Sequence, residues 1–257
     1  MIGAGYDVVL FDLDGTIYRG DAAIPEAPEA VARARAAGVR PVFVTNNSSR
    51  TQAAVAAHLS AVGVRATPAE VETSAVVTAR LLAVRGVGSA FVIGEDGLLE
   101  ALRDAGVNVV DHEETTVDVV VVGFDRGLDY EKLRRACLLV ERGAALVATN
   151  ADPSFPAADG LWPGAGALLA AVEATTERTA EVIGKPASPL LEAALERGGG
   201  GVPLVVGDRL DTDIAGAAGL GWESLLVLTG VTTRDQLRAE GLQPTFVAED
   251  LRDLFRE

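Results

Sequence analysis

Apolar and polar residues alternate along the chain in segments that predict strands and helices in turn. Residues 6–13 (YDVVLFDL) form a short apolar run rich in β-branched residues, which is typical of a strand buried on both faces of a parallel sheet. Residues 25–37 follow with apolar positions at helical spacing, a proline at the start and Gly38 just past the end. A second buried strand is expected over residues 40–44. This order predicts a βαβ unit.

The same alternation continues to the C-terminus. Helices are expected over residues 51–62, 68–83, 97–105, 130–142, 212–220 and 233–240, with another beginning at 164–166. Strands are expected over residues 90–93, 107–110, 117–122, 145–148, 203–206 and 224–228, with a last strand and helix in 245–255. The pattern predicts an α/β fold. Because the chain starts afresh near residues 85 and 183, we expect residues 1–82 and 183–257 to form one core domain, with 83–182 inserted as a second domain.

Charge and composition narrow the classes of function. The 257 residues contain 22 Lys and Arg against 37 Asp and Glu, a net charge of −15, so we expect no nucleic-acid partner. The N-terminal residues lack a basic leader pattern, and no uncharged stretch approaches the roughly 20 apolar residues of a bilayer span, so we expect no membrane partner and a cytoplasmic protein. The single cysteine, Cys137, excludes an internal disulfide and is expected to pack in the core.

Polar residues follow four of the expected strands. Open parallel sheets bind ligands at the carboxyl ends of their strands. The four strand ends read FDLDGT (11–16), FVTNNS (43–48), VIGKP (182–186) and VVGDRLDTD (205–213). Together they supply several carboxylates, a Thr/Asn pair and one lysine, but no histidine. Such carboxylates directly after buried strands are costly unless they are paired or bind a metal, so these strand ends predict a site with oxygen ligands.

Each of these segments also has a purely structural interpretation. Asp12 and Asp14 are compatible with turn capping, and the Thr45-Asn46 pair with a helix cap. A second capping pair, Asp208 and Asp213, would serve the helix expected at 212–220. Lys185 is harder to explain structurally, because the chain has only 2 lysines among 257 residues and otherwise uses arginine. A retained lysine indicates that a compact point charge is required.

In their order along the chain, the segments DLDGT, VTNNS, GKP and GDRLDTD resemble the four motifs of the haloacid dehalogenase superfamily of phosphohydrolases. The insert, the TNNS sequence and residues 149–166 (TNADPSFPAADGLWPGAG) resemble the NagD-like and p-nitrophenylphosphatase-like subfamily. The resemblance implies a doubly wound, Rossmann-like parallel-sheet core with an inserted α/β cap. It also implies a Mg²⁺-dependent phosphatase that hydrolyses small organic phosphate monoesters, such as phosphoglycolate and the phosphates of sugars, glycerol, nucleotides or pyridoxal. Caps of this subfamily often mediate homodimers.

The resemblance also assigns roles to the residues at the strand ends. Asp12 would be the nucleophile that forms an aspartyl-phosphate, and Asp14 would protonate the departing alcohol and later accept a proton from water. Lys185 would neutralise the nucleophile and the phosphate. The phosphoryl oxygens would be held by Thr45, Asn46 and Asn47. The metal would be bound by Asp12, the Asp14 backbone carbonyl and Asp208, with Asp213 orienting the metal shell or Lys185.

The residues leave three other functions open. A phosphotransferase or phosphomutase would use the same scaffold with a different acceptor, and an inactive binding protein of this superfamily would lack activity altogether. A Rossmann dehydrogenase is disfavoured, because residues 10–17 contain no Gly-x-Gly turn.

The remaining candidates lie away from the motifs. We expect no role for His58 and His112, and Asp211 is interpreted as a surface residue. Four residues of the insert are candidates for the face of the cap that meets the substrate: Asn150, Asp152, Phe155 and Trp162. Substituting Asp152 or Trp162 should then change the ranking of substrates more than the hydrolysis of p-nitrophenyl phosphate.

Overall fold

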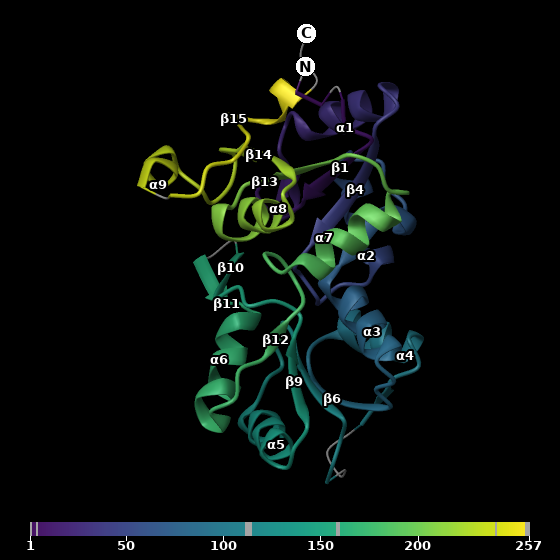
Figure 1. Ribbon diagram of the computed structural model, residues 1–257, viewed down its shortest axis with the longest axis vertical. Helices are drawn as coiled ribbons and strands as arrows, with labels where there is room; N and C mark the ends of the chain where they lie inside the picture. The colour runs from purple at the N-terminus through teal and green to yellow at the C-terminus, as the bar shows by residue number, and fades with distance from the viewer. Residues whose placement is uncertain (1, 4, 111–114, 158–159, 240, 255–257) are drawn as a thin grey trace. The chain divides into compact units, whose positions relative to one another are not determined.

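The computed structural model describes residues 2–3, 5–110, 115–157, 160–239 and 241–254. The chain folds into two compact units, which we call the core unit and the cap unit (Figure 1). The core unit comprises Met1–Thr45, Gln52–Glu72 and Lys185–Glu257, and the cap unit comprises Asn46–Thr51 and Thr73–Gly184.

Within the described residues, the core unit contains a six-stranded sheet in the spatial order β15, β14, β13, β1, β4, β5. The strands are β1 (Val8–Asp12), β4 (Arg40–Thr45), β5 (Val71–Thr73), β13 (Pro203–Gly207), β14 (Glu223–Val227) and β15 (Phe246–Ala248). Strand β1 pairs in parallel with β4 and β13, and the parallel pairing continues through β14 to β15. Runs of apolar, β-branched residues suit such strands because both faces of the sheet are buried.

Helices cover both faces of this sheet, as expected for a doubly wound fold. On one face, α1 (Ala27–Ala36) and α2 (Gln52–Ala61) pack around Phe11 and Phe43, whose ring centroids lie 6.2 Å apart. On the other face, α7 (Ser188–Arg197) packs on β1 and β4, and α8 (Ala215–Leu220) packs on β14. Helix α9 (Arg234–Ala239) and the 3-10 helix η3 (Leu251–Leu254) lie near the end of the chain. No helix among the described residues is both long enough and apolar enough to cross a bilayer.

The cap unit is a second α/β fold. Its described strands form a five-stranded sheet in the order β12, β9, β8, β6, β7 and a separate antiparallel hairpin, β10–β11. The strands are β6 (Ser89–Ile93), β7 (Asn108–Val109), β8 (Val119–Val122), β9 (Ala145–Ala148), β10 (Ser154–Ala157), β11 (Gly160–Pro163) and β12 (Glu181–Val182). Helices α5 (Tyr130–Glu141) and α6 (Ala165–Thr176) pack on one face of this sheet, where Cys137 is buried as expected.

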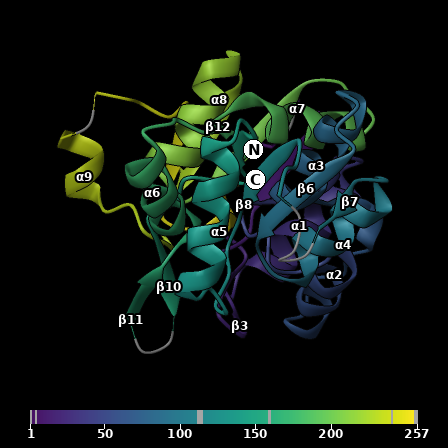
Figure 2. The same ribbon diagram turned by 90° about the horizontal axis from the view of Figure 1, so that it is seen from below.

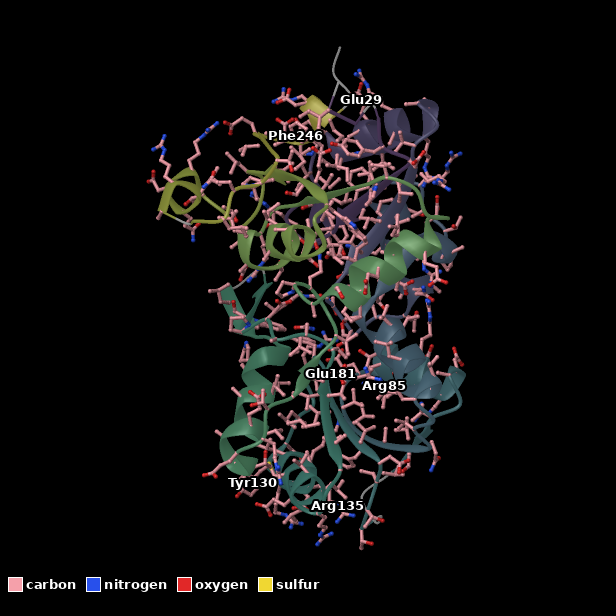
Figure 3. All side chains as sticks on the ribbon, in the orientation of Figure 1. Glu29, Arg85, Tyr130, Arg135, Glu181 and Phe246 are labelled. Atoms are coloured by element: carbon pink, nitrogen blue, oxygen red, sulfur yellow. The ribbon has the colours of Figure 1, made fainter. Side chains whose placement is uncertain are left out.

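Helices α3 (Ser74–Val84) and α4 (Asp96–Asp104) lie on the opposite side of the cap sheet (Figure 2). An ion pair joins α3 to the edge of the sheet: the guanidinium of Arg85, just past the end of α3, donates to both carboxylate oxygens of Glu181 at 2.6 and 2.7 Å. Figure 3 shows the two side chains together within the cap unit. Both are about half exposed, so the pair contributes little to stability.

The segment 68–83, expected to be one helix, instead contains three elements: the 3-10 helix η1 (Pro68–Glu70), strand β5 and helix α3. Its apolar spacing fits a helix locally, but Glu72 of β5 is fully buried and accepts a hydrogen bond from Arg197 Nε at 2.6 Å. The Thr73 hydroxyl then accepts from the amide of Val76 and caps α3. Contacts with a distant helix thus override the local helical pattern.

Two further expectations about the elements are corrected. Residues 182–186 do not end a strand of the core sheet, because β12 pairs with β9 in the cap sheet. The helix expected over 212–220 is a π-helical turn, η2 (Leu210–Ile214), followed by α8. The two units also differ from the division expected after residues 82 and 182, since α3 and residues 46–51 belong to the cap unit.

Candidate active site

Three adjacent strands of the core sheet present polar residues at their carboxyl ends. Asp12 is the last residue of β1, and Thr45 is the last residue of β4. The parallel register places Asp12 opposite Val44, so Thr45 lies next to it on the neighbouring strand. On the other side of β1, Asp208 directly follows β13. The topology thus brings together three strand ends that lie far apart in the sequence.

Lys185 links two of the aspartates predicted at these strand ends. Its ammonium donates to Asp12 Oδ1 at 2.6 Å and to Asp213 Oδ1 at 2.7 Å. The lysine side chain is only 3% exposed. Burial alone would lower the pKa of Lys185, but the Asp12 and Asp213 carboxylates outweigh burial and raise it. Lys185 is therefore a fixed positive charge.

Asp12, Asp208 and Asp213 offer carboxylate oxygens that all lie within 4.8 Å of one another, a grouping found among the described residues. Burial and the two neighbouring carboxylates raise the pKa of Asp12, although Lys185 opposes them. Burial, followed by the Asp213 charge, raises the pKa of Asp208 to about 7. Three carboxylates thus face one ammonium, which leaves an excess of negative charge.

This excess is what a bound divalent cation would neutralise. In the described part of the chain, Asp208 Oδ1 is buried and accepts no hydrogen bond, which is costly unless another group meets it. Carboxylate oxygens are also the ligands that Mg²⁺ prefers. The residues present therefore fit a magnesium ion held by Asp12 and Asp208.

Glycines make room for the carboxylates. A Cβ atom on Gly230 would lie 1.8 Å from Asp208 Oδ2, and one on Gly15 would lie 2.5 Å from the same oxygen. A Cβ atom on Gly207 would lie 2.2 Å from the Asp213 carboxyl carbon. Only glycine fits at these three positions without moving an aspartate.

A fourth strand end of the core sheet, that of β14, contributes to the site, and the sequence analysis missed it. Beyond β14, the amide of Val231 donates to Asp208 Oδ2 at 2.6 Å, and Gly230 precedes it. The Thr229 hydroxyl donates to the carbonyl of Gly15 at 2.7 Å. This strand end has no charged residue, so a search for carboxylates and lysines does not detect it. Its signal is the pair Thr229 and Gly230, which begins two residues past the end of a buried strand.

The π-helical turn η2 separates the three aspartates of the GDRLDTD segment. Asp213 is 1% exposed, and its Oδ2 accepts from the amide of Arg209 at 3.2 Å. Asp211 points away: its side chain is 66% exposed and binds the Arg209 guanidinium through both oxygens, at 3.0 and 2.6 Å. The interpretation of Asp211 as a surface residue agrees with this exposure.

Asp14 lies just past the end of β1 and is half-buried. It is not a member of the carboxylate cluster of Asp12, Asp208 and Asp213. Its backbone forms an isolated parallel bridge with Tyr18, at the start of the hairpin β2 (Tyr18–Arg19) and β3 (Ala22–Ala23). The hairpin, which the sequence pattern did not predict, is thus joined directly to the segment that carries Asp14.

Asn46, which follows Thr45, is buried within the cap unit. Its side-chain amide donates to Asp152 Oδ2 at 3.1 Å. Its carbonyl accepts from the Asn150 amide and the Ser74 hydroxyl, each at 2.7 Å. A Cβ atom on Gly184 would lie 2.5 Å from Asn46 Oδ1. Cap residues therefore fix both the backbone and the side chain of Asn46.

The other candidates have different surroundings. Asn47 Oδ1 accepts from both the amide and the hydroxyl of Ser49, at 2.9 and 2.7 Å, which closes a local turn. The Phe155 ring packs against Phe124 with centroids 5.3 Å apart. Trp162, on β11, is 39% exposed.

Of the two histidines, one lies outside the described residues and one is in contact with the core. His112 is not among the described residues. His58, for which we expected no role, contacts both the ring of Tyr18 and the carbonyl of Gly20.

Comparison with known proteins identifies the family. Residues 9–108 match the family described as haloacid dehalogenase-like hydrolase, and residues 182–254 match a second family of related hydrolases. The chain is 40% identical to D-glycerol 3-phosphate phosphatase of Mycobacterium tuberculosis, over 100% of this chain and 73% of that protein. The chain belongs to the haloacid dehalogenase-like hydrolases. The resemblance drawn from the four motifs is confirmed.

One further relative and one solved structure support the NagD-like, p-nitrophenylphosphatase-like subfamily for this hydrolase. The chain is 38% identical to 5′-nucleotidase YutF of Bacillus subtilis, over 96% of this chain and 97% of the relative. A crystal structure of the M. tuberculosis glycerol phosphate phosphatase in complex with magnesium matches with a TM-score of 0.93 at 39% identity, covering 100% of this chain and 78% of that one. The expected fold class, a parallel-sheet haloacid dehalogenase core with an α/β insert, is confirmed as well.

Proposed function

We propose that this hydrolase is a Mg²⁺-dependent phosphatase that cleaves small organic phosphate monoesters through an aspartyl-phosphate. One observation carries the proposal: the buried ammonium of Lys185 bridges Asp12 and Asp213 beside the orphaned carboxylate oxygen of Asp208. A nucleophilic carboxylate next to a fixed cation and a cation-binding pair is the arrangement that phosphoryl transfer requires, because nucleophile and substrate are both anionic.

In the first step, an Asp12 carboxylate oxygen attacks phosphorus and the bond from phosphorus to the ester oxygen breaks. Asp14 donates its proton to the departing oxygen, so the alcohol leaves neutral. In the second step, water attacks phosphorus, and Asp14 accepts the proton that the water loses. The bond between Asp12 and phosphorus then breaks, which releases inorganic phosphate and restores the carboxylate.

The surrounding residues offset the negative charge of this reaction. Lys185 lies within hydrogen-bond distance of Asp12 and would also meet a phosphoryl oxygen. We assign the other phosphoryl contacts to the Thr45 hydroxyl and to the segment of Asn46 and Asn47 that follows it, as the resemblance implies. Mg²⁺ bound by Asp12, Asp208 and the Asp14 carbonyl, with Asp213 orienting this set, would supply further positive charge at the phosphoryl group.

Phosphate release from p-nitrophenyl phosphate tests the catalytic assignment. We expect release to require Mg²⁺, to stop in excess EDTA and to be abolished in Asp12→Asn. Loss of the acid and base group in Asp14→Asn should lower the rate by about 10² to 10⁴. Asp211→Asn is the matched control, because Asp211 is exposed and lies outside the carboxylate cluster. Turnover by purified, folded Asp12→Asn would refute the assignment.

The substrates of phosphatases of this kind differ in the alcohol that leaves, so the leaving group defines the substrate. Two relatives carry the names glycerol phosphate phosphatase and nucleotidase, so we propose that the substrate is a small polar monoester of this kind. We further propose that the insert, expected at residues 83–182, selects the leaving group. A panel of glycerol 3-phosphate, nucleoside 5′-monophosphates, sugar phosphates, phosphoglycolate and pyridoxal phosphate, ranked by kcat/KM, identifies the class.

We also propose a homodimer formed through the cap unit and a cytoplasmic place of action. A single buried cysteine, Cys137, suits a reducing compartment. Mass measurement by light scattering, with the insert exchanged for that of a monomeric relative, tests the dimer. Cell fractionation tests the location.

A further inference from the structure

The hairpin of β2 and β3 continues directly from the segment that carries Asp14. The amide of Gly15 donates to the carbonyl of Tyr18 at 2.8 Å, and the amide of Ile24 donates to the carbonyl of Ile17 at 2.9 Å. Together with the bridge between Asp14 and Tyr18, these bonds make one backbone ladder. A displacement of the hairpin would therefore displace the backbone of Asp14.

On one side, residues that follow β14 hold this hairpin. The Thr229 hydroxyl donates to the carbonyl of Gly15 at 2.7 Å. The guanidinium of Arg19, from β2, donates to the carbonyl of Thr229. These two contacts fix one edge of the hairpin to the core unit.

On the other side, His58 from the last turn of α2 holds the tip of the hairpin. Its Nε2 lies 3.0 Å from the carbonyl oxygen of Gly20, and its ring meets the ring of Tyr18 edge to face, with centroids 4.7 Å apart at 85°. A carbonyl oxygen can only accept, so Nε2 carries the hydrogen. The His58 side chain is 14% exposed, although the bond to Gly20 itself lies at the surface.

We propose that His58 is a positioning residue for Asp14, acting through the hairpin. It joins a helix packed on the core sheet to the turn that is continuous with the Asp14 backbone. The proposal rests on the proposed role of Asp14 as proton donor and acceptor. Because that role belongs to the transition states of both steps, loosening the hairpin should lower kcat and leave KM nearly unchanged.

Three variants of α2 separate positioning from general stability. His58→Leu keeps much of the volume but removes the donor, and His58→Gln restores an N–H donor on a side chain of similar reach. Ser60→Ala is the matched control, because the Ser60 hydroxyl donates within its own helix, to the carbonyl of Ala56 at 2.9 Å. Should His58→Leu fail to fold, His58→Asn, whose amide is too short to reach Gly20, takes its place.

Two measurements are made on the Mg²⁺-loaded protein: steady-state hydrolysis of p-nitrophenyl phosphate, and hydrogen exchange in peptides covering residues 15–24. In His58→Leu we expect exchange to accelerate at least about fivefold and kcat to fall about tenfold, with KM within about twofold of wild type. His58→Gln should recover most of the kcat, and Ser60→Ala should match wild type in both measurements.

Two results in His58→Leu would overturn the proposal: unchanged exchange, or accelerated exchange with unchanged kcat. An equal loss of kcat in Ser60→Ala would also overturn it, because the effect would then be one of helix stability. Failure of the proposed function looks different. In that case Asp14→Asn would retain wild-type kcat, while exchange of the hairpin would still accelerate in His58→Leu.

Discussion

Replacing Lys185 by arginine keeps the positive charge but changes the space that the charge needs. The ammonium lies between two carboxylates, 2.6 Å from Asp12 Oδ1 and 2.7 Å from Asp213 Oδ1, with 3% of the side chain exposed. A planar guanidinium spreads its charge over three nitrogens and a central carbon. A guanidinium can form two parallel hydrogen bonds with one carboxylate, but it is too large to replace the ammonium between two carboxylates.

The structure sets the size of the effect. Forcing a larger group into a fully packed site costs about 1–3 kcal/mol. If this cost falls on the geometry of Asp12, the proposed nucleophile, each 1.36 kcal/mol lowers the rate tenfold, so we expect kcat/KM to fall by about 5- to 150-fold. In Lys185→Met the charge itself is lost. Leaving buried carboxylates unpaired costs about 3–5 kcal/mol, so the loss should exceed about 10².

The assay is hydrolysis of p-nitrophenyl phosphate at saturating Mg²⁺, with a thermal melt of each variant to establish folding. The chain provides a matched control in its other lysine. Lys132 pairs with Asp125 at 2.5 Å in the cap unit, and Lys132→Arg should leave kcat/KM within about threefold of wild type. If Lys185→Arg were as active as Lys132→Arg, the argument from the geometry of the ammonium would be refuted.

Three further predictions concern the metal and the cap. Burial raises the pKa of Asp208 to about 7. Between about pH 4 and 7, Asp208 therefore binds more protons in the folded, metal-free protein than in the unfolded chain. The melting temperature in EDTA should fall as the pH rises through this window. The gain in melting temperature from Mg²⁺ should therefore be larger at pH 8 than at pH 5, and an equal gain at both would contradict this. Gly230→Ala places a methyl group on the Asp208 carboxylate and should weaken Mg²⁺ binding, measured by calorimetry, by at least about tenfold. Asp152 accepts a hydrogen bond from Asn46. In contrast to the expectation from the sequence, Asp152→Ala should therefore raise KM for all esters alike, p-nitrophenyl phosphate included, whereas Trp162→Ala should change their ranking. A changed ranking in Asp152→Ala would instead support a role of Asp152 in substrate selection.

Much of the fold follows from local patterns in the sequence. The strands of the core are short apolar runs rich in β-branched residues, and burial on both faces makes them easy to recognise. The error at residues 68–83 has a different origin: strand β5 is held by the buried pair of Glu72 with Arg197, more than a hundred positions away. The local pattern of apolar and polar residues contains no information about such a distant partner.

The charged residues of the candidate site were predictable from the sequence. Asp12, Asp208 and Lys185 each stand at a segment end where a charge is costly unless it is used, and the structure brings them together with Asp213. Gly230 was not predictable in this way, because its role is to leave room for a carboxylate. The contacts of Asn46 in the cap unit, and those of His58 with the hairpin, likewise depend on tertiary neighbours.

The scarcity of lysine gives this protein a built-in chemical reporter. Amine-reactive reagents can modify only Lys132 and Lys185 among its side chains. Lys185 is 3% exposed, and its neighbouring carboxylates raise its pKa, so it remains protonated and unreactive in the folded protein. Lys132 is 23% exposed and accounts for the slow labelling expected of the native state. Peptide mapping during labelling therefore reads out the opening of the proposed catalytic centre, because modified Lys185 appears only when this lysine leaves its two aspartates.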